Sequence, residues 1–265
     1  MIELFSIYKY AFVLVIFTGI VLTIQGSHLV ARKESLQVLS LSQSAVLGAL
    51  VSALFLHEHS DILSFGISLA FLVIVKIFMN SYSDKSEPFY IVSYLFFIAT
   101  GYFLISLFPM LDSHMAASFF GDIVSLSETK TLILIAVFTL FLSLYLYKFN
   151  DLIQSTFKSS ILKIKKQNIM EEVLLTLVLT TSLFSLGFLY TVSFMIFPIV
   201  VLGKSFKNFK QSLIIMSSIS VLASVMGLAL SIIYSRVSTV SAQVIILLLF
   251  LLIYKLILRW TPNGK

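Results

Sequence analysis

Residues 173–203 read "VLLTLVLTTSLFSLGFLYTVSFMIFPIVVLG" and contain no charged side chain. An apolar helix needs about 20 residues to cross the hydrocarbon core of a bilayer, so this run is too long for one ordinary span and short for two. Lysines flank it at 158–166 and at 204–210. Because loops rich in lysine and arginine stay on the cytoplasmic side, both flanks are predicted to be cytoplasmic. An even number of crossings must separate them, which predicts a tight helical hairpin that turns near Gly187.

The whole chain has the composition of a membrane protein. Of its 265 residues 59% are hydrophobic and 11% are charged, and the mean hydropathy is +1.05. A soluble domain is nearer half apolar and a quarter charged. We therefore expect an all-α, polytopic membrane helix bundle of eight or nine transmembrane helices, forming one transmembrane domain over residues 1–265. The expected spans are residues 9–26, 36–57, 62–80, 88–110, 130–148, 172–186, 188–203, 212–233 and 241–258.

The basic residues of the loops predict an orientation. They fall mainly in alternate loops, which places the N-terminus outside the cell and the C-terminus in the cytosol. The net charge of +6 follows from this asymmetry and does not by itself imply nucleic-acid binding. Lys76 lies near the end of its predicted span, where a long side chain can extend towards the interface. The basic residues predicted to be cytoplasmic are Arg32, Lys33, Lys85, Lys148, Lys158, Lys163, Lys165, Lys166, Lys204, Lys207, Lys210, Lys255, Arg259 and Lys265.

Several kinds of chemistry are excluded by the sequence. The chain has no cysteine, which excludes disulfides, thiolate metal ligands and a cysteine nucleophile. It has no GxxxxGK[ST] phosphate-binding loop, no HExxH zinc motif and no GxSxG nucleophile elbow, so ATP hydrolysis would need another subunit. The predicted spans hold few ionisable residues, which disfavours a proton-coupled carrier. We therefore predict a subunit with no catalytic activity of its own.

Polar residues interrupt the second predicted span. Small residues let membrane helices approach closely, and buried polar groups in a bilayer need partners. This segment is therefore either a packing face or a helix that lines a transport path. The residues are Ser40, Ser42, Gln43, Ser44 and Gly48.

Histidines and carboxylates gather in the loops predicted to be external. The stretch "FLHEHSD" (55–61) carries His57, His59 and Asp61, and the segment 111–129 carries His114. Imidazole and carboxylate groups together suit Zn²⁺ or Mn²⁺, so these residues are candidates for the mouth of an ion path. The alternative is a solvated polar turn. His28, by contrast, is expected to be an interfacial residue and not a ligand.

Two further features are a cytoplasmic connector with several lysines and a proline inside a predicted span. The cytoplasmic connector "KFNDLIQSTFKSSILKIKKQNIMEE" (148–172) alternates apolar residues with lysines, a pattern typical of a helix attracted to anionic lipid head groups. Pro198 lies inside a predicted span, where proline removes one backbone hydrogen bond and kinks the helix. The kink either is structural or shapes the path.

Four segments taken together resemble a known family. They are "ARKESLQVLSLSQSAVLGAL" (31–50), "ASFFGDIVSLSETKTLILI" (117–135), "LGFLYTVSFMIFPIVVLGKSF" (186–206) and "SIIYSRVSTVSAQVIILLLFLL" (231–252). Their order, spacing and span pattern are similar to those of the ABC-3 family, the membrane permeases of bacterial ABC importers for zinc, manganese and iron. The residues that keep the family's structural pattern are Gly48, Gly121, Gly187 and Pro198, and the acid of the second segment is Asp122.

The chain departs from the family at its metal site. The resemblance implies an acid and a histidine four residues apart on the second helix, where Leu39 and Gln43 stand here. Leucine cannot ligate, and the glutamine amide offers a neutral oxygen that suits hard ions better than zinc. The glycine and proline of the family's last motif are also replaced, by Thr239 and Val240. Three explanations stay open: the metal site has moved, the substrate differs, or transport has been lost.

The resemblance implies a permease subunit that moves a divalent metal ion of the zinc, manganese or iron class into the cell. It implies a homodimer in the bacterial inner membrane, a cytoplasmic ABC ATPase that hydrolyses the ATP, and an extracellular or periplasmic metal-binding protein. Membrane lipids are the remaining partner, nucleic acid is not expected, and neither is a covalently bound cofactor. The alternatives are a secondary carrier and a non-transporting scaffold derived from a permease.

The resemblance also assigns roles to residues. Gln43, Ser42 and Asp122 would line or gate the path, with His57, His59, Asp61 and His114 at its mouth. The connector 148–172 would dock on the ATPase. Its candidate coupling residues are Lys158, Ser160, Lys163 and Lys166.

Overall fold

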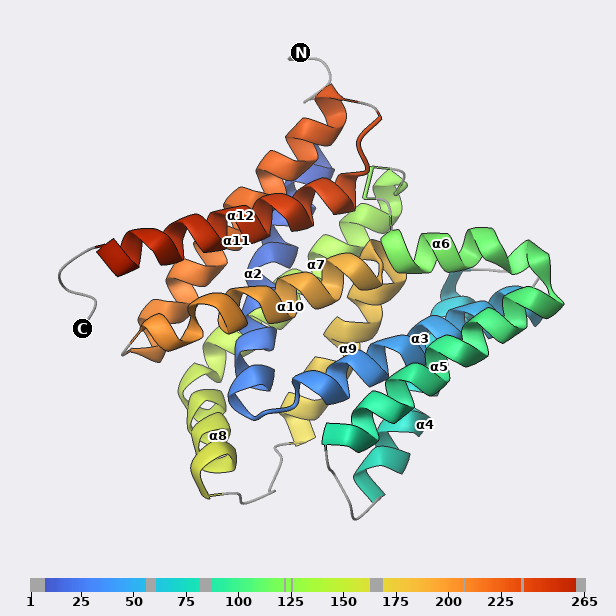
Figure 1. Cartoon of the computed structure of the whole chain (residues 1–265), viewed down its shortest axis with the longest axis horizontal. Helices are drawn as coiled ribbons and strands as arrows, with labels where there is room; N and C mark the ends of the chain where they lie inside the picture. The colour runs from blue at the N-terminus through green and yellow to red at the C-terminus, as the bar shows by residue number, and fades with distance from the viewer. Residues whose placement is uncertain are drawn as a thin grey trace. The chain divides into compact units, whose positions relative to one another are not determined.

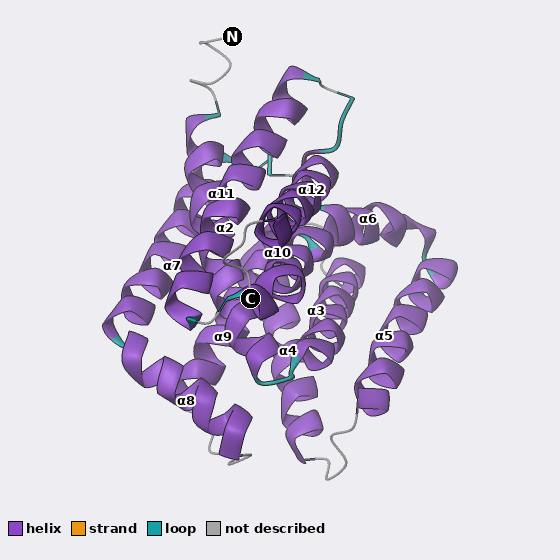
Figure 2. Cartoon of the chain, turned by 60° about the vertical axis from the view of Figure 1, so that its left-hand side comes forward, coloured by secondary structure: helices purple, strands orange, loops and turns teal. Residues whose placement is uncertain are grey.

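The structure, a computed structural model, describes most of the chain (Figure 1). The described residues are 8–55, 61–81, 87–121, 123–124, 126–162, 169–206, 208–234 and 236–260. Within these ranges every regular element is helical, as Figure 2 shows. The all-α prediction is therefore confirmed for the part of the chain that the structure describes.

Each predicted span corresponds to one helix. Among the described residues, seven of these helices are long and apolar enough to cross a membrane, and the other two, at residues 169–202, are the shorter pair of the predicted hairpin. The predicted membrane helix bundle is thereby confirmed. The helices are α2 (Lys9–Ala31), α3 (Ser35–Phe55), α4 (Asp61–Ser81), α5 (Glu87–Leu107), α7 (Glu128–Tyr147), α9 (Ile169–Leu186), α10 (Phe188–Leu202), α11 (Phe209–Ile233) and α12 (Thr239–Trp260).

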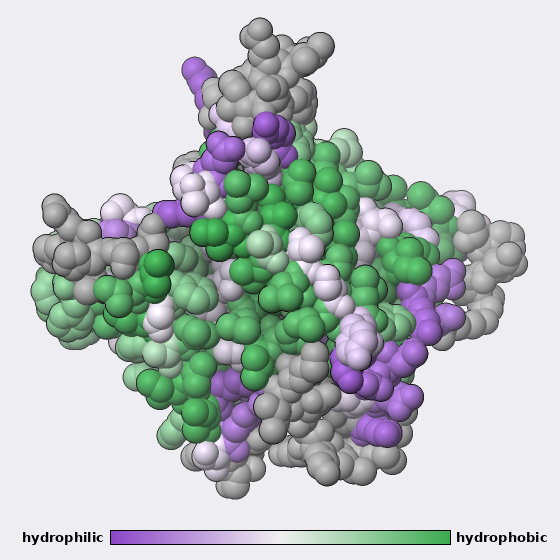
Figure 3. All heavy atoms as spheres, turned by 180° about the vertical axis from the view of Figure 1, so that it is seen from behind, coloured by the Kyte–Doolittle hydropathy of each residue, from purple (hydrophilic) through white to green (hydrophobic). Residues whose placement is uncertain are grey.

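Large apolar side chains are exposed on the long helices. Of the residues of α5, all of which are described, Tyr90 and Gly101 are buried, whereas Val92, Phe96 and Phe103 are exposed. Figure 3 shows hydrophobic residues over much of the face that it draws. An apolar surface of this extent is unfavourable in water and is expected where lipid covers the protein.

Two segments predicted as connections also contain helices. The segment 111–129 includes α6 (Asp112–Phe120), which follows the short 3-10 helix η1 (Pro109–Leu111). The connector includes α8 (Phe149–Leu162), and a second 3-10 helix, η2 (Gly203–Ser205), follows α10. The helix α6 and the two 3-10 helices are shorter than a membrane span, so a search for long apolar runs does not detect them. The helix α8 lies in the connector, whose alternating pattern predicted an interfacial helix.

The chain forms two compact units. The first comprises Met1–Arg32, Asp122–Gln167 and Ser193–Lys265, and the second comprises Lys33–Gly121 and Asn168–Val192. In the first unit α2 packs against α7, α8 and α11, and α11 packs against α12. In the second unit α3 packs against α4, α5, α6 and α9; the first two of these lie beside it in both cartoon views (Figures 1 and 2).

Small residues allow α2 to lie close to its neighbours in the first unit. A Cβ atom on Gly19 would lie 3.3 Å from atoms of α11, and one on Gly26 would fall on the backbone carbonyl of Met195 in α10. Between these glycines, Thr23 Oγ1 donates to Ser220 Oγ of α11 at 2.7 Å. Close backbone approach at small residues, supported by such hydrogen bonds, holds membrane helices together.

Pro198 lies inside α10. Because proline has no N–H group, the carbonyl of Phe194 one turn earlier loses its helical donor. Thr23 Oγ1 of α2 lies 3.5 Å from that carbonyl oxygen, at the long end of hydrogen-bonding distance. The hydroxyl proton of Thr23 is donated to Ser220 at 2.7 Å, so the longer contact with Phe194 is secondary to that bond. A polar side chain of a neighbouring helix nevertheless lies next to the turn that the proline interrupts.

The helices α9 and α10 are separated by one residue, Gly187, which confirms the predicted break at this glycine. Gly187 has a φ of +83°, and Gly121, which ends α6, has a φ of +61°. Glycine adopts these angles without the clash that a side chain would cause. A Cβ atom on Gly187 would lie 2.5 Å from the backbone nitrogen of Gly121, and one on Gly121 would fall on the carbonyl of Leu186. The two backbones are therefore in direct contact within the second unit.

Candidate transport site

Polar side chains of α3 are buried within the second unit. Ser40 and Ser42 are fully buried, and Gln43 is 2% exposed. In the part of the chain that the structure describes, Ser40 Oγ, Ser42 Oγ and Gln43 Nε2 have no hydrogen-bond partner. A buried polar atom left unpaired costs about 1–3 kcal/mol. A helix that keeps several of them is unusual unless a ligand, a water molecule or another subunit meets them.

Other serines of the same helix are satisfied locally. Ser44 Oγ donates to the carbonyl of Leu41, and Ser52 Oγ to that of Ala49, each at 2.7 Å. Such bonds to the preceding turn are common for serine in helices. The unpartnered atoms are therefore confined to residues 40–43, where Ser40 and Gln43 share one face of the helix.

A narrow cavity lies beside α3 in the second unit. Ala45 and Ala49 line it together with Ser68 of α4 and Thr180 of α9. Ser68 is 2% exposed, and its hydroxyl also has no partner among the described residues. A Cβ atom on Gly48 would lie 2.8 Å from the Cα of Ser68, so the glycine permits this close approach of α3 and α4. Small residues thus leave space next to a helix that carries unpaired polar groups.

The structure describes only some of the residues predicted for the ion path. Ser42 and Gln43 are buried in the second unit, and His114 is exposed on α6. Among the described residues no group of three or more histidine, aspartate or glutamate side chains could hold a metal ion. The mouth of the path and the role of Asp122 stay predictions. The candidates outside the described residues are His57, His59, Asp122 and the side chain of Asp61.

The predicted coupling segment contains an amphipathic helix. In α8, Leu152 and Thr156 are buried, whereas Gln154 and Lys158 are exposed. Lys158 therefore lies on a polar face that a partner could contact. The coupling candidates outside the described part are Lys163, Lys166 and the side chain of Ser160.

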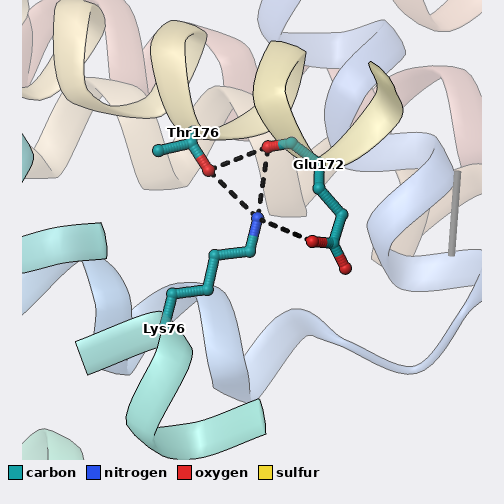
Figure 4. A network of polar contacts seen from close by, with 3 residues as sticks. All are labelled: Lys76, Glu172 and Thr176. Carbon is teal, nitrogen blue, oxygen red and sulfur yellow. Dashed lines mark hydrogen bonds and ion pairs between the residues drawn. The ribbon is translucent and has the colours of Figure 1, made fainter. Parts of the chain in front are cut away.

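Lys76 is buried in α4 and contacts the start of α9 (Figure 4). Its Nζ donates to Thr176 Oγ1 at 3.0 Å and to the backbone carbonyl of Glu172 at 3.2 Å, and lies 4.0 Å from the Glu172 carboxylate. The sequence suggested that this side chain extends towards the interface; in the structure it is 8% exposed and joins two helices of the second unit. Ionisable residues in membrane helices commonly pair in this way, because an isolated charge in lipid is costly.

His28, near the end of α2, joins three helices of the first unit. Its Nδ1 lies 2.6 Å from Thr156 Oγ1 of α8, and its Nε2 lies 2.8 Å from the Tyr145 hydroxyl of α7. Thr156 donates its own proton to the carbonyl of Leu152 at 2.9 Å. The Thr156 oxygen therefore accepts from Nδ1–H, which leaves Nε2 to accept from Tyr145.

The sequence analysis did not predict two groups of contacts in the first unit: those of the small residues of α2 with α10 and α11, and those of His28 with α7 and α8. Gly19, Thr23 and Gly26 recur at the spacing of small residues in close helix pairs, and this signal could have been found. The partners of His28 lie 117 and 128 residues further along the chain, so no local pattern reveals them.

Comparison with known proteins agrees with this fold. The sequence matches the ABC 3 transport family over residues 5–259, nearly the whole chain. The chain therefore belongs to the ABC 3 transport family and is a membrane transport subunit. The resemblance seen in the sequence is thereby confirmed.

A solved structure shares the architecture. PsaBC from Streptococcus pneumoniae in complex with Fab is similar to this chain with a TM-score of 0.76 and 23% sequence identity, covering 96% of this chain and 95% of that one. This likeness shows a common fold. No curated protein shows a significant match in sequence.

Proposed function

We propose that this chain is the permease subunit of an ABC importer for a divalent metal ion of the zinc, manganese and iron class. Two copies form the ion path, a cytoplasmic ABC ATPase drives the conformational cycle, and an external metal-binding protein delivers the ion. The two units of the chain act as one permease domain in the inner membrane, with the C-terminus in the cytosol. Family membership and the four matching motifs support the proposal.

The observation that carries the proposal is the set of unpartnered polar atoms on α3. Gln43 stands where the family resemblance places a histidine ligand, and its amide is buried with no partner for Nε2 in the described part of the chain. The unpartnered oxygens of this helix are the Ser40 and Ser42 hydroxyls, whereas the unpartnered Gln43 atom is the amide nitrogen, a donor that cannot ligate a cation. The carbonyl oxygen of the Gln43 amide is the atom that would contact an ion beside these hydroxyls. An ion that passes them exchanges part of its hydration shell for these groups, and the weak binding lets it leave again.

These oxygen donors favour the harder ions among zinc, manganese and iron. Carbonyl and hydroxyl oxygens suit harder ions such as Mn²⁺, whereas Zn²⁺ prefers imidazole and thiolate. Leu39, in the position of the family acid, contributes no ligand. We therefore propose that Mn²⁺ or Fe²⁺ is moved in preference to Zn²⁺.

Removing the path residues should abolish most of the transport. Proteoliposomes that hold the chain with its ATPase and binding protein should take up Mn²⁺ when ATP is supplied. The double variant Gln43→Ala with Asp122→Ala should lower the uptake rate about tenfold or more, since each lost contact of about 1.4 kcal/mol is worth a factor of ten. The measurement is the initial rate of uptake of radioactive Mn²⁺.

The matched control is Ser44→Ala, because Ser44 Oγ is already bonded to Leu41 in its own helix. Unchanged uptake in the double variant would overturn the site assignment. Uptake driven by an ion gradient without ATP would instead identify a secondary carrier.

Restoring the family's ligands should change the preferred ion. The double variant Leu39→Asp with Gln43→His places a carboxylate and an imidazole one turn apart on α3. Since this pair suits Zn²⁺, we expect the Zn²⁺/Mn²⁺ uptake ratio in competition to rise about tenfold. An unchanged ratio would show that α3 does not contact the ion.

A further inference from the structure

We infer that His28 and Lys76 are positioning residues that fasten the two ends of the connector 148–172 to transmembrane helices and transmit its movement. The inference rests on the proposed function, in which this connector docks on the ATPase. It goes beyond that function because it names the contacts through which docking reaches the membrane.

The first end of the connector is held by His28. The helix α8 places Thr156 on its buried face, 1% exposed, and the His28 imidazole, 3% exposed, contacts it at 2.6 Å. The other ring nitrogen contacts Tyr145 at 2.8 Å, at the end of α7. The ring also meets Phe209 of α11 edge to face, with centroids 5.5 Å apart. A rotation of α8 therefore pulls directly on α2.

The second end is held by Lys76. Glu172 closes the connector and lies in the first turn of α9, and its backbone carbonyl and carboxylate both face the Lys76 ammonium (Figure 4). Thr176, one turn later, receives a further hydrogen bond from the same group at 3.0 Å. A shift of the start of α9 therefore pulls on α4.

Polar contacts suit this role better than apolar packing. A hydrogen bond between buried groups weakens steeply when its distance or angle leaves a limited range, so it ties one atom of a helix to one atom of its neighbour. Apolar packing is less specific, because it spreads the contact over many weak atom pairs. Each anchor lies within one of the two units, the first binding α8 and the second binding the start of α9.

Two substitutions of His28 separate its two bonds. Asparagine places its amide where Nδ1 stands, so His28→Asn keeps the bond to Thr156 of α8 and loses the bond to Tyr145. Glutamine places its amide where Nε2 stands, so His28→Gln keeps Tyr145 and loses Thr156. Thr156→Val and Tyr145→Phe remove the same bonds from the other side. At the second anchor Lys76→Met removes the ammonium, whereas Glu172→Gln keeps the carbonyl contact and serves as its control.

The first measurement tests attachment without the ATPase. Because the chain has no cysteine, spin labels can be placed at Gln154→Cys on α8 and Gln211→Cys on α11, two exposed positions of the first unit. The distance distribution between them, in chains diluted with unlabelled copies, should be narrow in the parent and in His28→Asn, and broad in His28→Gln and Thr156→Val. An equally narrow distribution in all four would overturn the inference.

The second measurement tests transmission. In proteoliposomes with the ATPase and binding protein, Mn²⁺ moved per ATP hydrolysed should fall about three- to tenfold in Thr156→Val, His28→Gln and Lys76→Met, the loss expected for one hydrogen bond. Tyr145→Phe, His28→Asn and Glu172→Gln should keep the parent ratio of Mn²⁺ moved per ATP. The two His28 variants then differ in this ratio, because His28→Asn keeps the bond to Thr156 and His28→Gln does not.

The inference about His28 and Lys76 and the proposed transport function predict different results in these experiments. If the parent complex shows ATP-dependent uptake and all variants share its coupling ratio, the inference is wrong while the proposed function stands. If the parent complex shows no ATP-dependent uptake of Mn²⁺, Fe²⁺ or Zn²⁺, the proposed function is wrong and the inference is overturned with it.

Discussion

Gly187→Ala is expected to destabilise the folded protein by about 3 kcal/mol or more. Two costs add. An L-residue at a φ of +83° costs about 1–2 kcal/mol, and forcing an extra carbon into a packed site costs about 1–3 kcal/mol. The Cβ atom would lie 2.5 Å from the backbone nitrogen of Gly121, and backbone atoms cannot swing aside as a side chain can. The measurement is the midpoint of thermal unfolding of the purified protein in detergent.

The matched control for this variant is Gly66→Ala in α4. Among the described residues, a Cβ atom on Gly66 would have no atom within 4 Å outside its own helix. Alanine is a better helix former than glycine by about 1 kcal/mol, so this variant should unfold at the same or a higher temperature. Equal stability of Gly187→Ala and the parent would contradict the direct contact of the two backbones.

Gly26→Ala is expected to loosen α2 from α10 at a cost of about 3 kcal/mol. The added methyl group would fall on the carbonyl of Met195, so the two helices would have to separate. Thr23, three residues earlier, would then lose its place beside Phe194 and Ser220. We expect a lower unfolding midpoint and a smaller yield of folded protein from membranes.

Gly101→Ala in α5 provides the comparison for this second variant. A Cβ atom there would meet only flexible side-chain ends, at 3.5 Å from Leu50 and 3.9 Å from Met115. It should change the unfolding midpoint little. If Gly26→Ala behaves like Gly101→Ala, the close crossing of α2 and α10 is absent from the protein in the membrane.

The sequence was sufficient to predict the membrane fold, because each helix that crosses lipid needs a long run of apolar residues. Runs of apolar residues predicted every long helix, and the lysines on both sides of residues 173–203 predicted a turn at Gly187. The spacing of the motif in residues 31–50 also identified Gly48, but only the structure shows that this glycine lies against Ser68. The helix α6 escaped prediction since it is shorter than a span and partly polar, whereas the alternation of apolar residues and lysines in the connector predicted a helix where α8 lies.

The candidate site could be predicted only where a family motif exists. Gln43 was found because a motif marks its position, and the structure added that its amide is buried and unpartnered among the described residues. Lys76 and His28 could not be assigned, because their meaning depends on residues such as Glu172 and Thr156 far along the chain. Contacts between distant segments leave no trace in local periodicity.

The helices α9 and α10 meet at Gly187, and both are apolar. At 1.5 Å per residue α10 is about 22 Å long, against about 30 Å for the hydrocarbon layer. An irregular residue between two such helices must be shielded by protein where lipid surrounds them. The buried Leu186 and Phe188 provide that shield, and the Gly187 amide and carbonyl bond to Leu183 and Thr191. The break between the two helices therefore leaves neither backbone polar group of Gly187 unpaired, so a substitution there acts through its clash with Gly121 and not through lost hydrogen bonds.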